Sequence, residues 1–290
     1  AAELRNKRGA PAIETALVRH EVAFCLGQMG ATEPVALAAL RETLSDEQED
    51  PMVRHEAGEA LGAIADGASE ALLERLASSA EAEASTPREV VETCMLALRR
   101  LRTVQKMRAA ATADGELDEA FSGATPYKSV DPAPAADADA TDADLLAQLT
   151  DEGCDLWMRY GALFALRNRG GSSAARAVAA ALGASSALLR HEAAYSLGQL
   201  QSDAANAKLR DVLNDNSEHP MVRHEAAEAL GSIATDEAEA ALRSAMEAAD
   251  HPIVAQACEV ALDILACERS GEEYIAPLTE EEEEALANGN

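Results

Sequence analysis

Most of the histidines in this sequence, the residues most typical of a metal site, lie in one short phrase that occurs four times. Each copy places a histidine directly before a glutamate, and Leu-Gly follows five residues after the glutamate. These copies contain four of the six histidines in the chain. Imidazole and carboxylate groups are ligands for zinc and for non-haem iron. The phrase therefore predicts a metal site built from eight residues: His20, Glu21, His55, Glu56, His191, Glu192, His224 and Glu225.

A repeated phrase also has a structural explanation that needs no metal. One Arg-His-Glu on a helix is commonly a surface ion pair with an incidental histidine, and a repeat protein can keep a consensus residue for packing alone. Here the histidine and the glutamate are kept while their neighbours change, as at Phe24 and Tyr195 or at Gly58 and Ala227. That selective retention favours the metal site over packing.

The ligand set narrows the choice of metal without fixing it. Two facing halves of the chain would supply enough ligands for two metals, each with two histidines and at least one carboxylate. Such a set without cysteine suits non-haem iron, whose open positions suit oxygen chemistry. Zinc or manganese in a hydrolase is an alternative that the sequence does not separate from iron.

The spacing of the phrases predicts the elements that must position them. His20 and His55 are 35 residues apart, and His191 and His224 are 33 apart, which are periods typical of helix-turn-helix repeats. His20 and His191 are 171 residues apart, so a two-repeat block occurs twice. The expected fold is an all-α solenoid in two pseudo-symmetric halves that face each other.

These repeats divide the chain into four segments. We predict an N-terminal half over 1–107, an acidic linker rich in Pro, Ala and Asp over 108–143, a C-terminal half over 144–268 and an acidic tail over 269–290. Because the linker loses helical periodicity, we expect it to be disordered or loosely ordered.

The first half is expected to be shorter than the second. Residues 4–9 echo residues 166–171, but 16 residues separate Leu4 from His20 whereas 25 separate Leu166 from His191. We therefore predict that the N-terminal half lacks most of its first repeat. The uncapped apolar face that results should cost stability.

Composition bounds the partners and the compartment. A formal net charge of −28 argues against nucleic acid and against anionic membrane surfaces, whose phosphates it would repel. The charge suits a basic partner, although solubility alone explains it equally well. No apolar run approaches the ~18–20 residues of a membrane span. The five cysteines lack CxxC spacing, which favours a reducing, cytoplasmic compartment, and we expect a monomer.

Several stretches of the sequence resemble one known family. They are PMVRHEAGEALGAI at 51–64, YKSVDPAP at 127–134, MRYGALFALRNRGG at 158–171 and CEVALD at 258–263. With the four His-Glu pairs, they make about residues 4–268 similar to deoxyhypusine hydroxylase. The resemblance implies a HEAT-repeat solenoid and a di-iron monooxygenase. Such an enzyme uses dioxygen to hydroxylate the deoxyhypusine side chain of translation initiation factor 5A, which completes hypusine.

The resemblance also implies roles for the eight motif residues and two iron ions as cofactors. Glu56 and Glu225 are expected either to support the metal ligands from behind or to contact the substrate amine. An acidic cleft between the halves would attract this cationic side chain. The other six residues are expected to form two ligand sets, with His20, His55 and Glu192 on one iron and His191, His224 and Glu21 on the other.

Two other classes of protein share this repeat style. A HEAT-repeat phycobilin lyase would bind a tetrapyrrole chromophore, and it would not need four His-Glu pairs. A metal-free HEAT scaffold would need none of them. The iron content of the purified protein separates all three.

Overall fold

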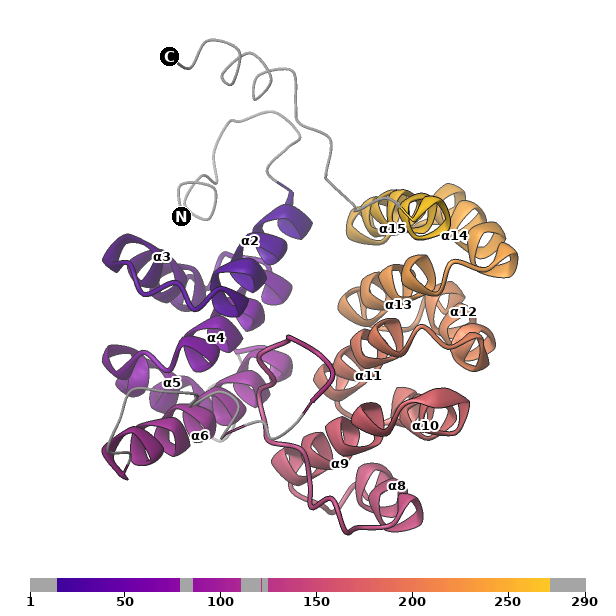
Figure 1. The fold of residues 1–290 in the computed structure, drawn as a ribbon. Helices are drawn as coiled ribbons and strands as arrows, with labels where there is room; N and C mark the ends of the chain where they lie inside the picture. The colour runs from indigo at the N-terminus through magenta and orange to yellow at the C-terminus, as the bar shows by residue number, and fades with distance from the viewer. Residues whose placement is uncertain (1–14, 79–85, 111–120, 122–124, 272–290) are drawn as a thin grey trace.

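The computed structural model describes residues 15–78, 86–110, 121 and 125–271. Within these residues every regular element is a helix, which confirms the predicted all-α fold. The helices form two halves that face each other across the middle of the molecule (Figure 1).

The N-terminal half is a row of inner helices backed by outer ones. The inner helices that the structure describes are α2 (Ala16–Gln28), α4 (Pro51–Ile64) and α6 (Arg88–Ala110). The outer elements are α3 (Pro34–Ser45), the 3-10 turn η1 (Gly67–Ser69) and α5 (Glu70–Ala77).

The C-terminal half repeats this arrangement with one more inner helix. Its inner row is α9 (Leu156–Arg169), α11 (Ala187–Leu200), α13 (Pro220–Ile233) and α15 (Pro252–Ser270). Its outer elements are α8 (Asp142–Thr150), α10 (Gly171–Ala179), η2 (Ala180–Gly183), η3 (Asp203–Ala205), α12 (Asn206–Asn214) and α14 (Asp236–Ala248).

A pseudo-twofold relation matches the two halves. The repeated phrases make α2 the counterpart of α11 and α4 the counterpart of α13, so α6 corresponds to α15. The halves touch where α2 meets α15 and where α11 meets α6. The pseudo-twofold relation makes these two contacts equivalent, because α2 corresponds to α11 and α15 corresponds to α6.

The helices that carry the second phrase of each half begin in the same way. Pro51 and Pro220 occupy the first turn, where a helix needs no backbone donor. The side chains of Asp50 and His219 cap these helices, because each accepts a hydrogen bond from the backbone N–H two residues later. His251 caps α15 in the same manner. Both histidines outside the phrase are therefore helix caps.

The Leu-Gly that follows each phrase lets neighbouring inner helices approach closely. A Cβ atom on Gly62 would lie 2.6 Å from the Cβ of Ala97 on α6, and one on Gly27 would lie 2.8 Å from the Cα of Ala60 on α4. Close-packed interiors do not hold carbon atoms this near to each other, so any side chain would push the helices apart. The glycines thus bring the phrase helices close enough to share ligands.

The predicted linker is ordered where the structure describes it, so the expectation of loose order is wrong for residues 125–141. Asp131 is buried, and the backbone N–H of Ala136 donates to the carbonyl oxygen of Gly161 on α9 over 2.8 Å. Helix α8 begins at Asp142, inside the predicted linker. A composition rich in proline and aspartate indicates that regular helix is absent, but fixed contacts can still form.

Two other predictions concern residues that lie mostly outside the described part of the chain. The shortened first repeat falls on residues 1–14 and most of the acidic tail on 272–290, both outside the described part of the chain. Among the described helices, none is long and apolar enough to cross a membrane. All five cysteines are described, and all are free.

Candidate metal centre

The four phrase histidines converge between the halves, although they come from four different helices. The ring centroids of His20 and His55 are 5.6 Å apart, and those of His191 and His224 are 5.5 Å apart. Across the halves, His20 lies 5.0 Å from His224, and His55 lies 5.2 Å from His191. All four histidines are buried. The repeated phrase therefore builds one cluster rather than four separate surface sites.

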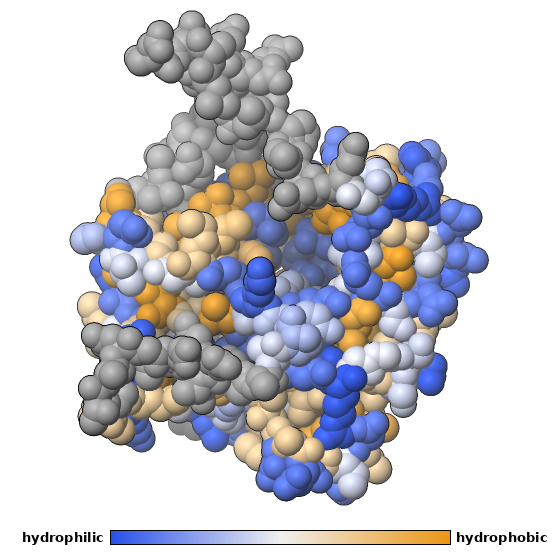
Figure 2. Space-filling view, viewed as in Figure 1, coloured by the Kyte–Doolittle hydropathy of each residue, from blue (hydrophilic) through white to orange (hydrophobic). Residues whose placement is uncertain are grey.

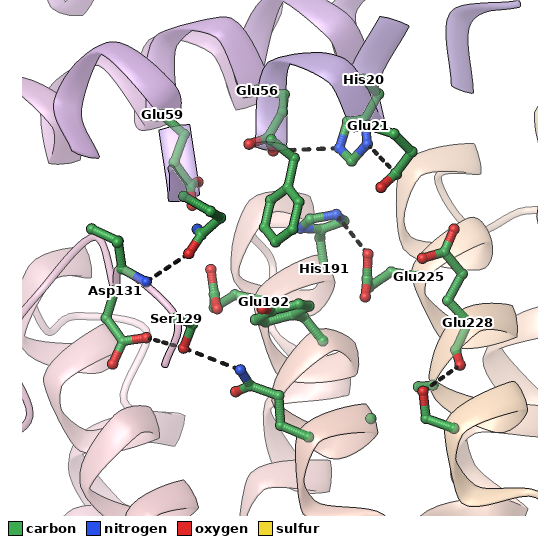
Figure 3. A pocket seen from close by; sticks show the side chains of 18 of the residues that line it. His20, Glu21, Glu56, Glu59, Ser129, Asp131, His191, Glu192, Glu225 and Glu228 are labelled. Atoms are coloured by element: carbon green, nitrogen blue, oxygen red, sulfur yellow. Dashed lines mark hydrogen bonds and ion pairs between the residues drawn. The ribbon is translucent and has the colours of Figure 1, made fainter. Parts of the chain in front are cut away.

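A glutamate of the N-terminal half lies beside its histidine pair. The Oε2 atom of Glu56 is 3.4 Å from the Nε2 atom of His20 (Figure 3). It is 4.0 Å from the Nε2 atom of His55. The reason is helical geometry. Glu56 follows His55 on α4, and one residue turns a helix by about 100°, which directs the carboxylate toward the neighbouring α2.

The C-terminal half repeats this arrangement. The Oε2 atom of Glu225 is 3.2 Å from the Nε2 atom of His191 on α11 and 3.4 Å from the Nε2 atom of His224 on α13. Each half thus offers two imidazoles and one carboxylate from adjacent inner helices. The pseudo-twofold relation extends to the individual ligand atoms.

The other two phrase glutamates are placed differently. The carboxylate of Glu21 is 2.9 Å from the Nδ1 atom of His20, and with Glu228 it also comes within 4.8 Å of a ring nitrogen of His224. Glu192 is 5% exposed and makes no hydrogen bond or ion pair with any described residue. The expected ligand sets had Glu21 and Glu192 in these positions, whereas Glu56 and Glu225 are the glutamates whose carboxylates lie within 4.0 Å of both Nε2 atoms of a histidine pair.

Orphaned nitrogen atoms test whether a metal fits here. Within the described residues, the Nε2 atoms of all four phrase histidines are buried and lack a well-aligned hydrogen-bond partner. Nδ1 of His224 lies 2.7 Å from the carbonyl oxygen of Met221, which turns its Nε2 toward the cluster. Buried polar atoms rarely go unpaired, so a bound cation is the partner that this donor set fits. His20, His55 and Glu56 offer ligand atoms within 4.8 Å of one another.

Burial tunes the charges of these groups. It lowers the pKa of His55 well below its ordinary value, that of His191 to about 3 and that of His224 to about 4. Burial would also lower the pKa of His20, but hydrogen bonds to Glu21 and Glu56 hold it well above its usual value. Neutral imidazole is the form that binds metal ions, so three of the four histidines are ready to do so at neutral pH.

A cavity of about 300 Å³ leads from the histidines to solvent between the halves. Figure 2 shows hydrophilic residues around this hollow. Phe24 and Tyr195 meet edge to face within it, with ring centroids 5.9 Å apart. The carboxylates of Glu59 and Glu228 also line the cavity (Figure 3). Burial raises the pKa of both glutamates well above the ordinary value.

Sequence reasoning did not identify three of these cavity features. Glu59 and Glu228 carried a usable signal, because each lies three residues, one helical turn, after the glutamate of a phrase. Phe24 and Tyr195 occupy matching positions, which differ in residue type between the two copies of the phrase. The loop at 129–132 forms one wall of the cavity, and its sequence gave no sign of that placement.

Comparisons with known proteins agree with this architecture. The family model described as HEAT repeats matches residues 14–95, 143–219 and 181–263. A curated deoxyhypusine hydroxylase from Arabidopsis thaliana is 50% identical over 258 residues, which are 89% of this chain and 78% of that protein. The Gallus gallus deoxyhypusine hydroxylase is 47% identical, over 90% of this chain and 83% of that protein.

A solved structure is similar over most of the chain as well. It is human deoxyhypusine hydroxylase in complex with glycerol, with a TM-score of 0.77 and 45% sequence identity. The match covers 88% of this chain and 81% of the human one.

Proposed function

This chain belongs to the deoxyhypusine hydroxylase family, and on that premise we propose that it hydroxylates the deoxyhypusine side chain of translation initiation factor 5A. It is an oxygen-using monooxygenase, with two iron ions as the proposed cofactors and dioxygen as co-substrate. The observation that carries the proposal is the buried cluster of four histidines and two carboxylates in two equivalent sets. Iron, when bound, would supply the activation of dioxygen.

The proposed ligands of each iron come from one half. His20, His55 and Glu56 would hold one ion. The C-terminal ion would be held by the three residues that match them, His191, His224 and Glu225. This assignment exchanges the roles that the sequence-based expectation gave to the glutamates. It rests on each carboxylate lying within 4.0 Å of both Nε2 atoms of its histidine pair, and it leaves Glu21 and Glu192 to face the substrate.

The cavity beyond the ions suits a long cationic side chain. Glu192 supports this, because burial raises the pKa of its carboxyl to about 8 and an incoming ammonium group would stabilise the ionised form. Glu59 and Glu228 add two carboxylates to the cavity wall. The rings of Phe24 and Tyr195 offer apolar contact to the methylene groups between the amines. Close walls on several sides would exclude water from the reacting carbon.

Mass spectrometry of the substrate tests the proposed function. The chain is loaded with ferrous iron and mixed with deoxyhypusine-containing factor 5A in air, and the substrate is expected to gain one oxygen atom. Iron-free chain and an oxygen-free reaction are the matched controls, and neither should change the substrate mass. An iron-loaded chain that leaves the substrate unmodified would contradict the proposal. If the chain binds a tetrapyrrole and no iron, it would instead be a chromophore lyase. If it binds neither ligand, it would be a scaffold.

A further inference from the structure

The relative placement of the two halves determines how far apart the two ligand sets lie. Each set comes from one half, so no single half fixes the separation between them. Helix contacts between the halves occur where α2 meets α15 and where α6 meets α11. A third connection runs between these contacts, through the loop that follows α6.

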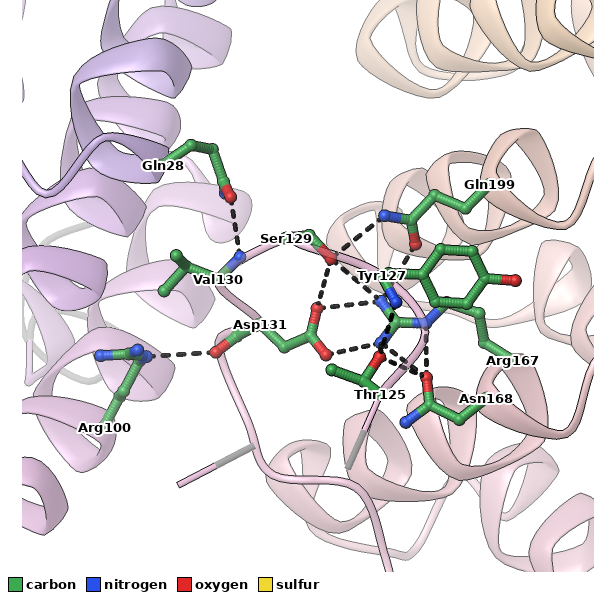
Figure 4. A network of polar contacts seen from close by, with 10 residues as sticks. All are labelled: Gln28, Arg100, Thr125, Tyr127, Ser129, Val130, Asp131, Arg167, Asn168 and Gln199. Atoms are coloured by element: carbon green, nitrogen blue, oxygen red, sulfur yellow. Dashed lines mark hydrogen bonds and ion pairs between the residues drawn. The ribbon is translucent and has the colours of Figure 1, made fainter. Parts of the chain in front are cut away.

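Asp131 in this loop is bound by both halves (Figure 4). Its side chain is 3% exposed and accepts two hydrogen bonds from the guanidinium of Arg167 on α9, at 2.9 and 2.6 Å. Its backbone carbonyl accepts a hydrogen bond of 3.1 Å from Nε of Arg100 on α6. Both arginines are fully buried. Asp131 is thus a buried junction between the N-terminal and C-terminal halves.

Each arginine also donates hydrogen bonds to a helix that carries a phrase histidine. Arg100 also donates to the carbonyl oxygens of Gly62 and Ala63 at the end of α4, over 3.1 and 2.9 Å. Arg167 donates to Oε1 of Gln199 on α11 over 3.0 Å. A continuous chain of buried and partly buried hydrogen bonds therefore connects the helix of His55 with the helix of His191.

A second route uses two glutamines that the pseudo-twofold relation makes equivalent. Gln28 and Gln199 each lie eight residues after a phrase histidine, on α2 and α11. Oε1 of Gln28 accepts a hydrogen bond from the backbone N–H of Val130 over 2.7 Å. Nε2 of Gln199 donates to Oγ of Ser129 over 3.1 Å. One loop thus receives a matching residue from each half.

We propose that the loop at residues 129–131, clasped by Arg100, Arg167 and the two glutamines, sets the distance between the two metal half-sites. This inference rests on the proposed function, because it concerns how two irons are spaced. The four residues that hold the loop are positioning residues: Arg100 and Arg167 lie outside the cavity, and Gln28 and Gln199 line its wall. The buried ion pair of Asp131 with Arg167 suits this task, since removing one partner leaves a charge that the interior tolerates poorly.

The test measures the iron–iron distance by X-ray absorption in oxygen-free, ferrous-loaded protein. Asp131→Asn keeps the volume of the side chain but cannot accept both Arg167 donors as an ion pair. We expect this variant to keep two irons per chain while its iron–iron scattering weakens or shifts, with turnover at least tenfold lower. The matched control is Asp155→Asn. Asp155 also pairs with an arginine of the other half, Arg99, at 2.9 Å, but both side chains are half exposed. Because exposed ion pairs contribute little, this variant should keep both the iron–iron distance and the turnover of the parent.

An Asp131→Asn protein with the parent iron–iron distance would overturn the inference, whatever its turnover. If that variant does not hold iron, the double variant Gln28→Ala, Gln199→Ala decides by the same measurement, because it leaves no charge unpaired. A parent chain without iron would contradict the proposed function. If the parent chain binds two irons and every variant keeps the same iron–iron distance, the role proposed for the loop is wrong and the proposed function still stands.

Discussion

Glu56 on α4 lies closer to His20 on the neighbouring helix α2 than to His55, the histidine that precedes it in the chain. Its Oε2 atom is 3.4 Å from Nε2 of His20 and 4.0 Å from Nε2 of His55. Each half-site is therefore assembled between two repeats, and a single repeat cannot form it. The two-repeat block is therefore the smallest unit that can bind one ion, and its duplication gives two such units.

Replacing Glu56 should remove one ion. An amide is a much weaker iron ligand than a carboxylate, so we expect Glu56→Gln to weaken iron binding at the N-terminal half-site more than tenfold. Iron per chain, measured by plasma mass spectrometry after dialysis, should fall by about half. Glu47→Gln makes the same change at an exposed position and should keep all the iron. Full iron occupancy in Glu56→Gln would contradict the ligand assignment.

Replacing Glu192 should separate substrate capture from metal binding. Glu192→Gln is expected to keep both irons and to lose about ten- to a hundredfold in affinity for the deoxyhypusine protein, the worth of a charge-assisted hydrogen bond of ~1.5–3 kcal/mol. Calorimetric titration measures this affinity. The loss should persist in high salt, because salt screens long-range steering but not buried contacts. Loss of iron instead would make Glu192 a ligand, as the sequence-based expectation had it.

The close approach of the inner helices predicts a stability difference between two glycines. Gly62→Ala should destabilise the fold by about 1–3 kcal/mol, because the new methyl group has no room beside Ala97. Gly183→Ala meets no neighbour within 4 Å and should leave the melting temperature nearly unchanged. Thermal unfolding of both variants checks this, and equal melting temperatures would mean that the inner helices are not held at this spacing.

The acid sensitivity of the fold should depend on Glu152. Hydrogen bonds from Arg159 and Ser185 lower the pKa of this carboxyl to about 2. The contribution of Glu152 to stability is therefore present above about pH 4.5 and is lost as the pH falls toward 2. Its side chain is half exposed, so solvent screening limits the effect to about 1 kcal/mol. The unfolding free energy of Glu152→Gln should fall less steeply between pH 5 and 2 than that of the parent.

Much of the architecture could be predicted from the sequence, because repetition is visible in it. The period of the His-Glu phrases indicated helical repeats, and the duplication indicated two halves. The assignment of glutamates to irons could not be obtained the same way. Whether Glu56 or Glu192 lies beside His20 depends on how α2 packs against α4, which a Gly-Ala contact fixes at the scale of a few ångströms.

The loop was the part of the fold that the sequence described least well. Its contacts to Arg100 and Arg167 join residues more than thirty positions apart, and no local pattern encodes them. In the sequence alone, an aspartate in a proline-rich segment looks like any solvated linker residue. The cytoplasmic location and the monomeric state, both expected from composition, stay predictions.

Iron content in two histidine variants tests the central claim most directly. His55 lies in the buried cluster, whereas His219 caps α13 and lies outside it. The parent chain, loaded with ferrous iron without oxygen and dialysed, should hold two irons. His55→Ala should hold about one, since each ion has only two histidine ligands, and His219→Ala should hold two. A parent chain that binds no iron, or equal iron loss in both variants, would contradict the account.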